Sequence, residues 1–539
     1  MRASRISIVI FSALLAFVVA GGWMRAQAQT FPGGASTAVH PGVLLSQAQL
    51  NYMKIMVQAH ADPFYTAFLK AQNSTWGSLT YVPLGPPAGG IIQCGSTSMP
   101  DIGCSASDSD GTAAYVQALL WYITGNQTYA NNAINIMNTY ANNFKGYAGY
   151  TPGDTCPSGT DCSNGPLQSA WDSQKWPRAA EIIRYSNAGW PAAQAAAFGT
   201  MLNTYMRPLL INGSTSNGNW EISMIEGLIG IGVYNDDAVA FNTGVTYWQQ
   251  RVPAYFYYHT DGAGPVSAPR GTADWYGQTV YDASVDGISQ ETCRDFGHAQ
   301  YGISGSLDAA ETAGIQGVNL YQDTQSITDG SQGTFNVNAQ NRLTSALEFN
   351  AYYLLNNPVP TSVCGGTVTL QIYPVDEIGY NEYHNRLGLS LPNTLQYLQT
   401  VIHQLPPQSM TESHIMVFET LTHGGDASSL QPFMMWTNGS SATLQSGTSA
   451  SYTVTVVPGS ASNPSVALSV GGLPAGVSYS FSPATVSGAG TSTLTITASS
   501  TAPSGSTCVL PSYTGIRRYP PCPKSTASRK AFLSGDARK

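Results

Sequence analysis

Between residues 46 and 422, apolar side chains recur at helical spacing in roughly a dozen segments joined by short polar connections. Strand-like alternation is rare here; a strand or an extended loop is expected only within 364–392. This succession predicts an all-α domain built from antiparallel helical hairpins. Hairpins arranged in a ring would bury their apolar faces, although the periodicity alone does not specify a ring. The predicted helices span 46–70, 113–124, 128–144, 171–185, 191–210, 217–234, 236–251, 289–321, 341–356, 394–404 and 411–422.

The N-terminus has the pattern of a secretory signal peptide. Arg2 and Arg5 precede the apolar run 6–20, and Ala26-Gln-Ala28 supplies small residues at the cleavage site. We therefore expect residues 1–28 to be removed and the chain to be exported to the periplasm or the extracellular space. The apolar run is short for a membrane span, and no membrane span is expected after cleavage.

The eight cysteines fit an oxidising compartment. Two pairs close in sequence predict local disulfides, and two further cysteines remain as a possible long-range pair. The local pairs are Cys94 with Cys104 and Cys156 with Cys162, and the long-range pair is Cys293 with Cys364. Cys508 and Cys522 belong to the C-terminal tail. The sequence has no C-x-x-C pair, and its histidines do not occur at the H-x-x-x-H or comparable spacing of metal ligands. We therefore expect neither a metal site nor a cofactor.

Past residue 425 the composition changes. Residues 450–457 and 491–498 alternate Ser or Thr with apolar residues, which is typical of strands. This part resembles the small immunoglobulin-like modules of secreted bacterial enzymes, in an incomplete form. We predict four parts after the signal peptide. They are a large helical domain over 29–424, a linker over 425–447, an immunoglobulin-like β module over 448–507 and a basic disordered tail over 508–539.

Basic residues are scarce in the body of the chain. Residues 29–507 contain 12 basic residues and carry a formal charge of −17. Such a surface repels nucleic acid, which is excluded as a partner. An acidic polysaccharide would need a local concentration of positive charge. Each arginine on a polar face is therefore a candidate ligand for such a polymer.

One such arginine lies in Ser289–Gly302. If this stretch is helical, Arg294, His298 and Tyr301 project from one face, and Glu291 joins them. The guanidinium could bind a carboxylate, and the imidazole and phenol could move protons. The alternative is structural: Arg294 is bound by Glu291 or Asp295, and the two rings belong to the core.

A second polar stripe lies on the apolar helix predicted over 217–234. Asn219, Ser223 and Glu226 are spaced to share one face. On a buried helix, such side chains need partners or a water-filled cleft. The Asn219 amide could donate hydrogen bonds to a substrate carboxylate, or Asn219 could simply cap the helix.

Two aromatic and polar clusters suit sugar binding. One, at 379–388, is expected to be a loop and contains Tyr380, Asn381, Tyr383, His384 and Arg386. The other contains His259 within 255–262, with Trp275 and Tyr276 nearby, and could form the wall of a saccharide groove. A turn rich in Asn and Tyr and a packed aromatic core are the respective alternatives.

Four stretches together carry a resemblance to a known family. Residues 217–221, 290–302, 311–321 and 380–388 are similar to the alginate lyase domain family of bacterial polysaccharide lyases. The similarity covers about residues 38–424, and Arg-Asp-x-x-His at 294–298 is its most specific part. The resemblance implies a mainly α, α/α toroid fold, an incomplete barrel of helical hairpins. It also implies cleavage of uronic-acid polymers by β-elimination.

The resemblance also implies roles for the residues. Asn219, Arg294 and His298 would neutralise the uronate carboxylate, and Tyr301 would act as base and then as acid. Well-known alginate lyases place His after the Asn, whereas this chain has Trp220. Tyr383, assisted by His384, is the alternative base. The residues expected to bind substrate are Trp220, Glu226, His259, Glu291, Tyr380, Asn381, His384 and Arg386.

The leading hypothesis is thus an exported lyase acting on alginate, glucuronan or a related acidic polysaccharide. The first alternative is a glycoside hydrolase on a similar helical ring, which would use two of the carboxylates Glu221, Glu226, Glu291 and Asp295. The second is a carbohydrate-binding protein without catalytic activity. An unsaturated, ultraviolet-absorbing product distinguishes the lyase from both.

Overall fold

The structure is a computed structural model. It describes residues 30–96, 99–271, 273–329, 333–405, 418–426, 433–437, 441–442, 444–458, 465–471, 473–502, 510–513 and 531–532. The predicted signal peptide, Cys508, Cys522 and nearly all of the tail lie outside the described residues.

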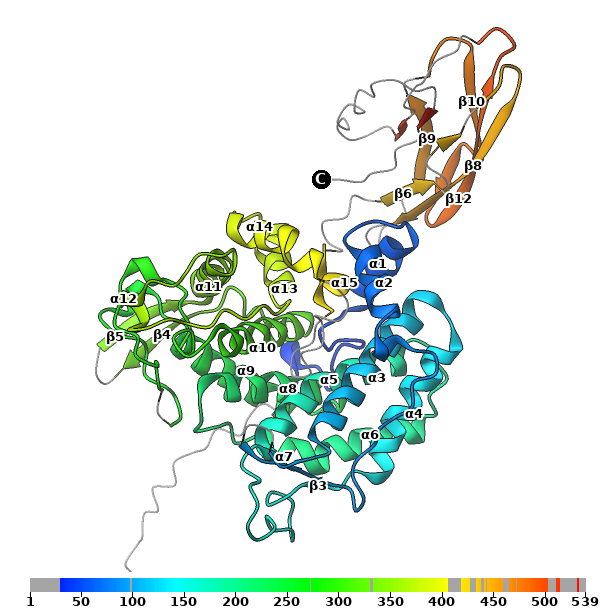
Figure 1. The fold of residues 1–539 in the computed structure, drawn as a ribbon. Coiled ribbons are helices and arrows are strands. Elements are labelled where there is room, and N and C mark those ends of the chain that lie inside the picture. Colours follow the sequence, from blue (N-terminus) through cyan, green and yellow to red (C-terminus); the bar gives the residue numbers. More distant parts are fainter. Residues whose placement is uncertain are drawn as a thin grey trace, which may run out of the picture.

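Helices dominate the chain up to residue 424 (Figure 1). They are α1 Gln47–Gln58, α2 Phe64–Gln72, α3 Cys104–Thr124, α4 Gln127–Asn143, α5 Gly165–Tyr185, α6 Ala192–Met201, α7 Arg207–Leu210, α8 Gly218–Tyr234, α9 Ala238–Tyr255, α10 Phe296–Ile315, α11 Ala339–Leu354, α12 Thr361–Cys364, α13 Glu377–Tyr380, α14 Pro392–Thr400 and α15 Glu419–His423. The predicted 46–70 helix is two helices, because α1 ends at Gln58 and Pro63 precedes α2.

An inner row of helices runs through the domain. The helix α5 packs against α3 on one side and α8 on the other, and α10 packs on the far side of α8. Outer helices cover this row: α4 packs on α3, α9 on α8 and α11 on α10. This arrangement of helical hairpins confirms the predicted α/α toroid, and the described helices form no closed barrel (Figure 1).

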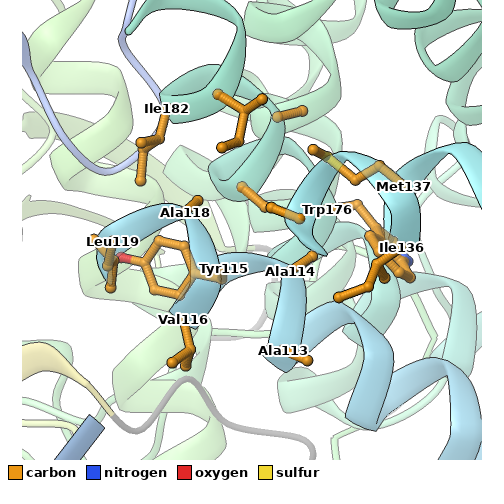
Figure 2. Close-up of a cluster of buried hydrophobic side chains, with 14 of the residues drawn as sticks. Ala113, Ala114, Tyr115, Val116, Ala118, Leu119, Ile136, Met137, Trp176 and Ile182 are labelled. Carbon is orange, nitrogen blue, oxygen red and sulfur yellow. The ribbon is translucent and has the colours of Figure 1, made fainter. Parts of the chain in front are cut away.

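Small residues let the inner helices approach one another. A Cβ on Gly227 of α8 would lie 2.7 Å from the Ser173 Cβ of α5. A Cβ on Gly305 of α10 would lie 2.7 Å from the Ile222 Cγ2 of α8. The alanine face of α3 acts in the same way beside Trp176, within the apolar cluster that fills the first half of the ring (Figure 2). A second buried cluster fills the half built from α8 to α14.

Short strands and disulfides fix the connections. The strands in the helical domain are β1 Ile91–Cys94, β2 Asp101–Ile102, β3 Gly146–Tyr147, β4 Thr324–Asp329 and β5 Gly333–Asn338. All three disulfides expected among the described cysteines are present: Cys94–Cys104, Cys156–Cys162 and Cys293–Cys364. The segment 365–376 is largely extended and makes one isolated bridge, Asp295 to Thr369.

Three sheets follow the helices in the described part of the chain, two larger ones and the two-stranded pair β7-β14. Their strands are β6 Phe433–Thr437, β7 Ser441–Ala442, β8 Ser449–Pro458, β9 Ser465–Gly471, β10 Val477–Ser482, β11 Thr485–Ser487, β12 Gly490–Ala498, β13 Leu510–Tyr513 and β14 Ala531–Phe532. One sheet has the order β10-β12-β8-β6 and the other β11-β9-β13, and side chains of both form one apolar cluster. The sheets extend beyond the predicted bounds of 448 and 507, and the immunoglobulin-like assignment remains a prediction.

None of the helices in the described part of the chain is long and apolar enough to span a membrane.

Candidate functional site

The Arg294 stretch is not one continuous helix. The helix α10 begins only at Phe296, and residues 290–294 form a turn before it. Asp295 ends the turn because its carboxylate accepts a hydrogen bond from the His298 N–H at 2.8 Å, as an N-cap. The predicted single helical face from Glu291 to Tyr301 is therefore wrong in its geometry.

The residues nevertheless meet, because the turn lies against the start of α8. The Asn219 N–H is 3.4 Å from Oε2 of Glu291, and Nη1 of Arg294 is 3.3 Å from Oε1 of the same carboxylate. Arg294 also lies 3.7 Å from Asp295. The structural alternative thus holds in part, since both acids contact Arg294, yet 35% of the Arg294 side chain stays exposed.

Asn219 is not the helix cap. Asn217 occupies the cap position of α8, and its side chain makes no capping hydrogen bond. The Asn217 amide instead donates to the Tyr276 hydroxyl at 2.6 Å. Asn219 is 5% exposed, and its Oδ1 has no hydrogen-bond partner within the described structure. This end of α8 therefore has polar groups available to a ligand.

Glu291 lies beneath these groups rather than among them. Its side chain is fully buried, and it also accepts a hydrogen bond from the Tyr255 hydroxyl at 3.2 Å. Burial raises the pKa of Glu291 to about 7, against the lowering effect of His298, Arg294, Tyr255 and Asn219. In this structure the buried Glu291 carboxylate contacts Asn219 and Arg294, and its contact with substrate stays a prediction.

His298 forms a pair with Asp295. Its Nδ1 lies 2.8 and 2.7 Å from the two carboxylate oxygens, and 30% of the His298 side chain is exposed. Burial would raise the pKa of Asp295, but hydrogen bonds from His298 and the charges of His298 and Arg294 outweigh it and lower that pKa. Because Asp295 holds Nδ1, the other ring nitrogen is the one that can face a ligand.

Tyr301 lies in an aromatic group beside His298. The Tyr301 ring centroid is 5.8 Å from His298, 6.2 Å from Trp171 and 5.8 Å from Tyr373. Trp171, which nothing in the spacing singled out, comes from the second turn of α5. Tyr373 arrives on the extended segment after α12, and its N–H donates to Gln300 at 2.9 Å. Trp220 is partly exposed beside Asn219.

The N-terminal parts of α5, α8 and α10 thus gather at one place. They contribute Trp171, Asn219 and His298 respectively. Helix N-termini carry partial positive charge, so their meeting favours an anionic group.

Glu226 lies deeper and is bound by other protein groups. It pairs with Arg178, which also binds Asp308 at 2.7 Å, and it accepts from Gln174 at 2.5 Å. Burial raises the pKa of Glu226 to about 8, while Arg178 opposes the shift. Glu226 therefore belongs to an ionic network between α5, α8 and α10, and its contact with substrate stays a prediction.

The 379–388 cluster is also structural. It is not a loop but the helix α13 followed by a π-helical turn, Asn381–Arg386. Tyr383 is fully buried and its hydroxyl donates to the Tyr321 carbonyl; its role as the alternative base stays a prediction. Arg386 binds Glu311 through both Nη atoms, at 2.7 and 2.9 Å, and also pairs with Asp426.

The remaining members of that cluster also make contacts within the protein. Tyr380 stacks on His384 at 4.7 Å, and the His384 Nδ1 lies 2.8 Å from the Leu389 carbonyl. Asn381 is buried and donates to Asp426. Ion pairs and ring contacts within the protein thus involve these residues, and their role in substrate binding stays a prediction.

His259 lies in a different environment. Its Nδ1 is 2.6 Å from Asp286, and 44% of its side chain is exposed. No contact joins it to Arg294 or Asn219 among the described interactions, so it stays a prediction. Within the described residues, no group of three or more His, Cys, Asp or Glu could hold a metal ion.

The part of the chain that carries these residues is similar to known proteins. Residues 103–336 match the family model described as alginate lyase. Among solved structures, the chain resembles alginate lyase A1-III from Sphingomonas species A1, at 16% identity and a TM-score of 0.43, covering 66% of this chain and 90% of that one. It also resembles an alginate lyase from Bacteroides ovatus, at 15% identity and a TM-score of 0.45, covering 71% and 99%. No curated protein matches.

The matched residues run from the start of α3 to within β5, and so include the inner helices α3, α5, α8 and α10 and the turn that carries Arg294. Residues 103–336 therefore form a domain of the alginate lyase family, and the chain is a polysaccharide lyase.

Proposed function

We propose that the chain is an exported lyase that cleaves a uronic-acid polymer, alginate or a glucuronan-like chain, by β-elimination at the Asn219–Arg294–His298 site. The observation that carries this proposal is the exposed Arg294 guanidinium beside the unpartnered Asn219 oxygen and the starts of three inner helices. Export is supported by the signal-like N-terminus and by three disulfides.

The chemistry requires these residue types. Removal of the C5 proton of a uronate leaves negative charge on the carbon and its carboxylate, so the carboxylate must be neutralised first. Arg294 can donate to one carboxylate oxygen, and the amide of Asn219 to the other after rotation of its side chain. His298, held by Asp295, adds a donor or a positive charge. A tyrosine then takes the C5 proton and returns a proton to the leaving glycosidic oxygen.

Glycoside hydrolysis is less well supported by the carboxylates. Glu221 binds Arg251 and Arg270, Glu226 binds Arg178, and Glu291 is buried. A hydrolase needs two carboxyl groups that reach the glycosidic bond from opposite sides. Asp295 is the most exposed of the four, with 18% of its side chain accessible, and it is held by His298.

The test is incubation with alginate, polymannuronate, polyguluronate and glucuronan. A lyase gives a product with an ultraviolet-absorbing double bond, and each cleavage also gives one reducing end. Reducing ends that form without absorbance would indicate the hydrolase. Binding of the polymers without either product would indicate the carbohydrate-binding protein.

Arg294→Lys tests the assignment to this site. Lysine keeps the charge but loses the planar pair of donors, so we expect kcat/KM to fall about 100-fold. Arg207→Lys is the matched control, because Arg207 pairs with Asp237 at the opposite end of α8 and is also partly exposed. Equal activities of the two variants would place the reaction elsewhere.

A further inference from the structure

Glu291 lies directly behind the groups that we propose to bind the uronate. Its Oε1 is 3.3 Å from Nη1 of Arg294, and its Oε2 is 3.4 Å from the Asn219 nitrogen. None of the Glu291 side chain is exposed, whereas 35% of the Arg294 side chain is. The buried carboxylate therefore contacts, from the protein side, the two residues that would hold a ligand carboxylate from the solvent side.

The contact between Glu291 and Arg294 is long for a buried carboxylate. Nη2 of Arg178, for comparison, lies 2.7 Å from Asp308. A guanidinium has five N–H donors, and Glu291 is within 3.5 Å of only one nitrogen of Arg294. Arg294 can therefore contact a second carboxylate without first leaving Glu291.

The charges around Arg294 decide how well such a second carboxylate binds. Asp295 already lies 3.7 Å from Arg294 and 2.7 Å from His298. When Glu291 is ionised, two acids face two basic side chains, and a uronate adds a further negative charge. The repulsion between Glu291 and the uronate acts at a buried position, where charges are weakly screened. A proton on Glu291 removes this repulsion.

Burial makes that proton easy to acquire. It raises the pKa of Glu291 to about 7, against the opposing effect of neighbouring donors and positive charges. The groups that face Glu291 come from several segments: Arg294, Asp295 and His298 from the start of α10 and the turn before it, Asn219 from α8, Tyr255 and Arg251 from α9, and Tyr276 from the loop after α9. At neutral pH the empty site therefore holds Glu291 in both its ionised and its protonated form.

We propose that Glu291 is a positioning residue that takes up one proton from solvent when a uronate carboxylate binds to Arg294 and Asn219, and releases it when the site empties. The inference rests on the proposed lyase function. The protonated acid no longer competes with the ligand for Arg294, so the guanidinium charge is available to the uronate. One proton enters with each bound carboxylate and leaves with it, so no reactant is consumed.

This exchange links substrate affinity to pH. The empty site binds the proton with a pKa of about 7, and the filled site binds it more tightly because the uronate adds negative charge. Affinity is therefore full below pH 7 and falls as pH rises above it, by at most about tenfold per pH unit. The turnover of the filled site does not include this proton uptake, so the effect belongs to KM and not to kcat.

The experiment measures competitive inhibition by a ligand that cannot be cleaved, using the full-length mature protein between pH 5.5 and 8.5. The probe is the methyl glycoside of the uronate whose polymer is cleaved, because it carries no sugar at C4. We expect its inhibition constant to rise about tenfold or more from pH 6 to 8.5 in the wild type. In Glu291→Gln, whose amide cannot ionise, the constant should change less than about threefold.

Two controls separate this effect from others. Asp376→Asn removes another buried acid, whose pKa is raised to about 8 by burial and by the charge of Glu377. No contact joins Asp376 to Arg294 or Asn219 among the described interactions, so this variant should keep the pH dependence of the wild type. Loss of the His298 proton would also weaken anion binding at high pH, but that effect would remain in Glu291→Gln.

A wild-type inhibition constant that does not change with pH, or a rise that persists in Glu291→Gln, overturns the inference while the lyase function stands. Calorimetric titration of the wild type with the same glycoside at pH 7.5, in phosphate and in Tris, counts the protons without any variant. An uptake of more than about half a proton supports the inference, and no uptake overturns it. A wild type that forms no unsaturated product from any polyuronate overturns the lyase function itself.

Discussion

Arg294 differs from three buried arginines of the helical domain in how far its charge is neutralised. Arg178, Arg251 and Arg342 are at most 2% exposed, and each binds a carboxylate within the core. Buried pairs of this kind hold the fold together but have no charge left for a ligand. Arg294 has a longer contact with Glu291 and remains exposed. The choice of Arg294 as the uronate ligand rests on this difference.

Glu291 sets a testable pH dependence. Its pKa of about 7 in the folded protein lies above the ordinary value, so the folded state keeps a proton that the unfolded chain loses. The stability from this group is therefore full at low pH and is lost as pH rises towards 7. Urea unfolding of wild type and Glu291→Gln from pH 4.5 to 7 should show the variant gaining about 1.4 kcal/mol per pH unit relative to wild type. A pH-independent difference would mean that Glu291 titrates normally.

At the scale of single residues, the sequence predicted which side chains come together better than how they are arranged. Asn219, Arg294 and His298 do meet, although Arg294 lies outside the helix. Spacing assumed a continuous helix, and it could not show that Asp295 would cap α10 after the turn. The error at 379–388 has another cause, since composition does not tell whether Arg386 and Tyr383 find their partners inside the protein or in a ligand.

Among the elements, the four-residue helix α12 connects two segments that lie at the start of α8. The Val363 carbonyl of α12 accepts from the Thr279 N–H, which fixes the segment that follows Tyr276, and the Cys293–Cys364 disulfide fixes the Arg294 turn. The segment after α12 reaches α10, where the Phe296 N–H donates to the Thr369 carbonyl at 3.0 Å. Helical periodicity could predict α8 and α10. The short helix α12 and the extended segment after it are too short or too irregular to give a periodic pattern in the sequence.

We expect two of the disulfides to differ in how much they contribute to the free energy of unfolding. Cys293 and Cys364 are 71 residues apart, whereas Cys156 and Cys162 are 6 apart. Cross-links over longer loops restrict the unfolded chain more, so Cys293→Ser/Cys364→Ser should cost about 2 kcal/mol more than Cys156→Ser/Cys162→Ser.

Activity should separate the same two variants. The first should also lose kcat, because it releases the Arg294 turn, and the second should not. Denaturant unfolding and steady-state kinetics on one polyuronate measure both effects. Equal kcat values would show that α12 does not position the site.

For the whole molecule, the helical and β parts have separate apolar clusters. The cluster between the two sheets contains residues 452–496, and none of its members comes from the helices. The helical domain ends later than α15, because Asp426 pairs with Arg386 and the Gly425 carbonyl accepts from Gln49 at 2.9 Å.

A chain ending at residue 430 should therefore keep kcat/KM on short oligouronates within about twofold and keep its thermal transition, because surface truncations away from packed features cost little. A chain ending at residue 417 should unfold at lower temperature, since it loses α15 and Asp426. Loss of activity in the longer chain would indicate that the sheets contribute to the site.

The Cys293–Cys364 bond also couples catalytic competence to the redox state of the surroundings. In a reducing cytoplasm the two sulfurs stay thiols, and the Arg294 turn is then joined to α12 only through noncovalent contacts. A cell that makes this enzyme would thus hold an immature form that gains its full arrangement on reaching an oxidising compartment. Production in a reducing host should yield folded protein of low specific activity that rises on mild oxidation.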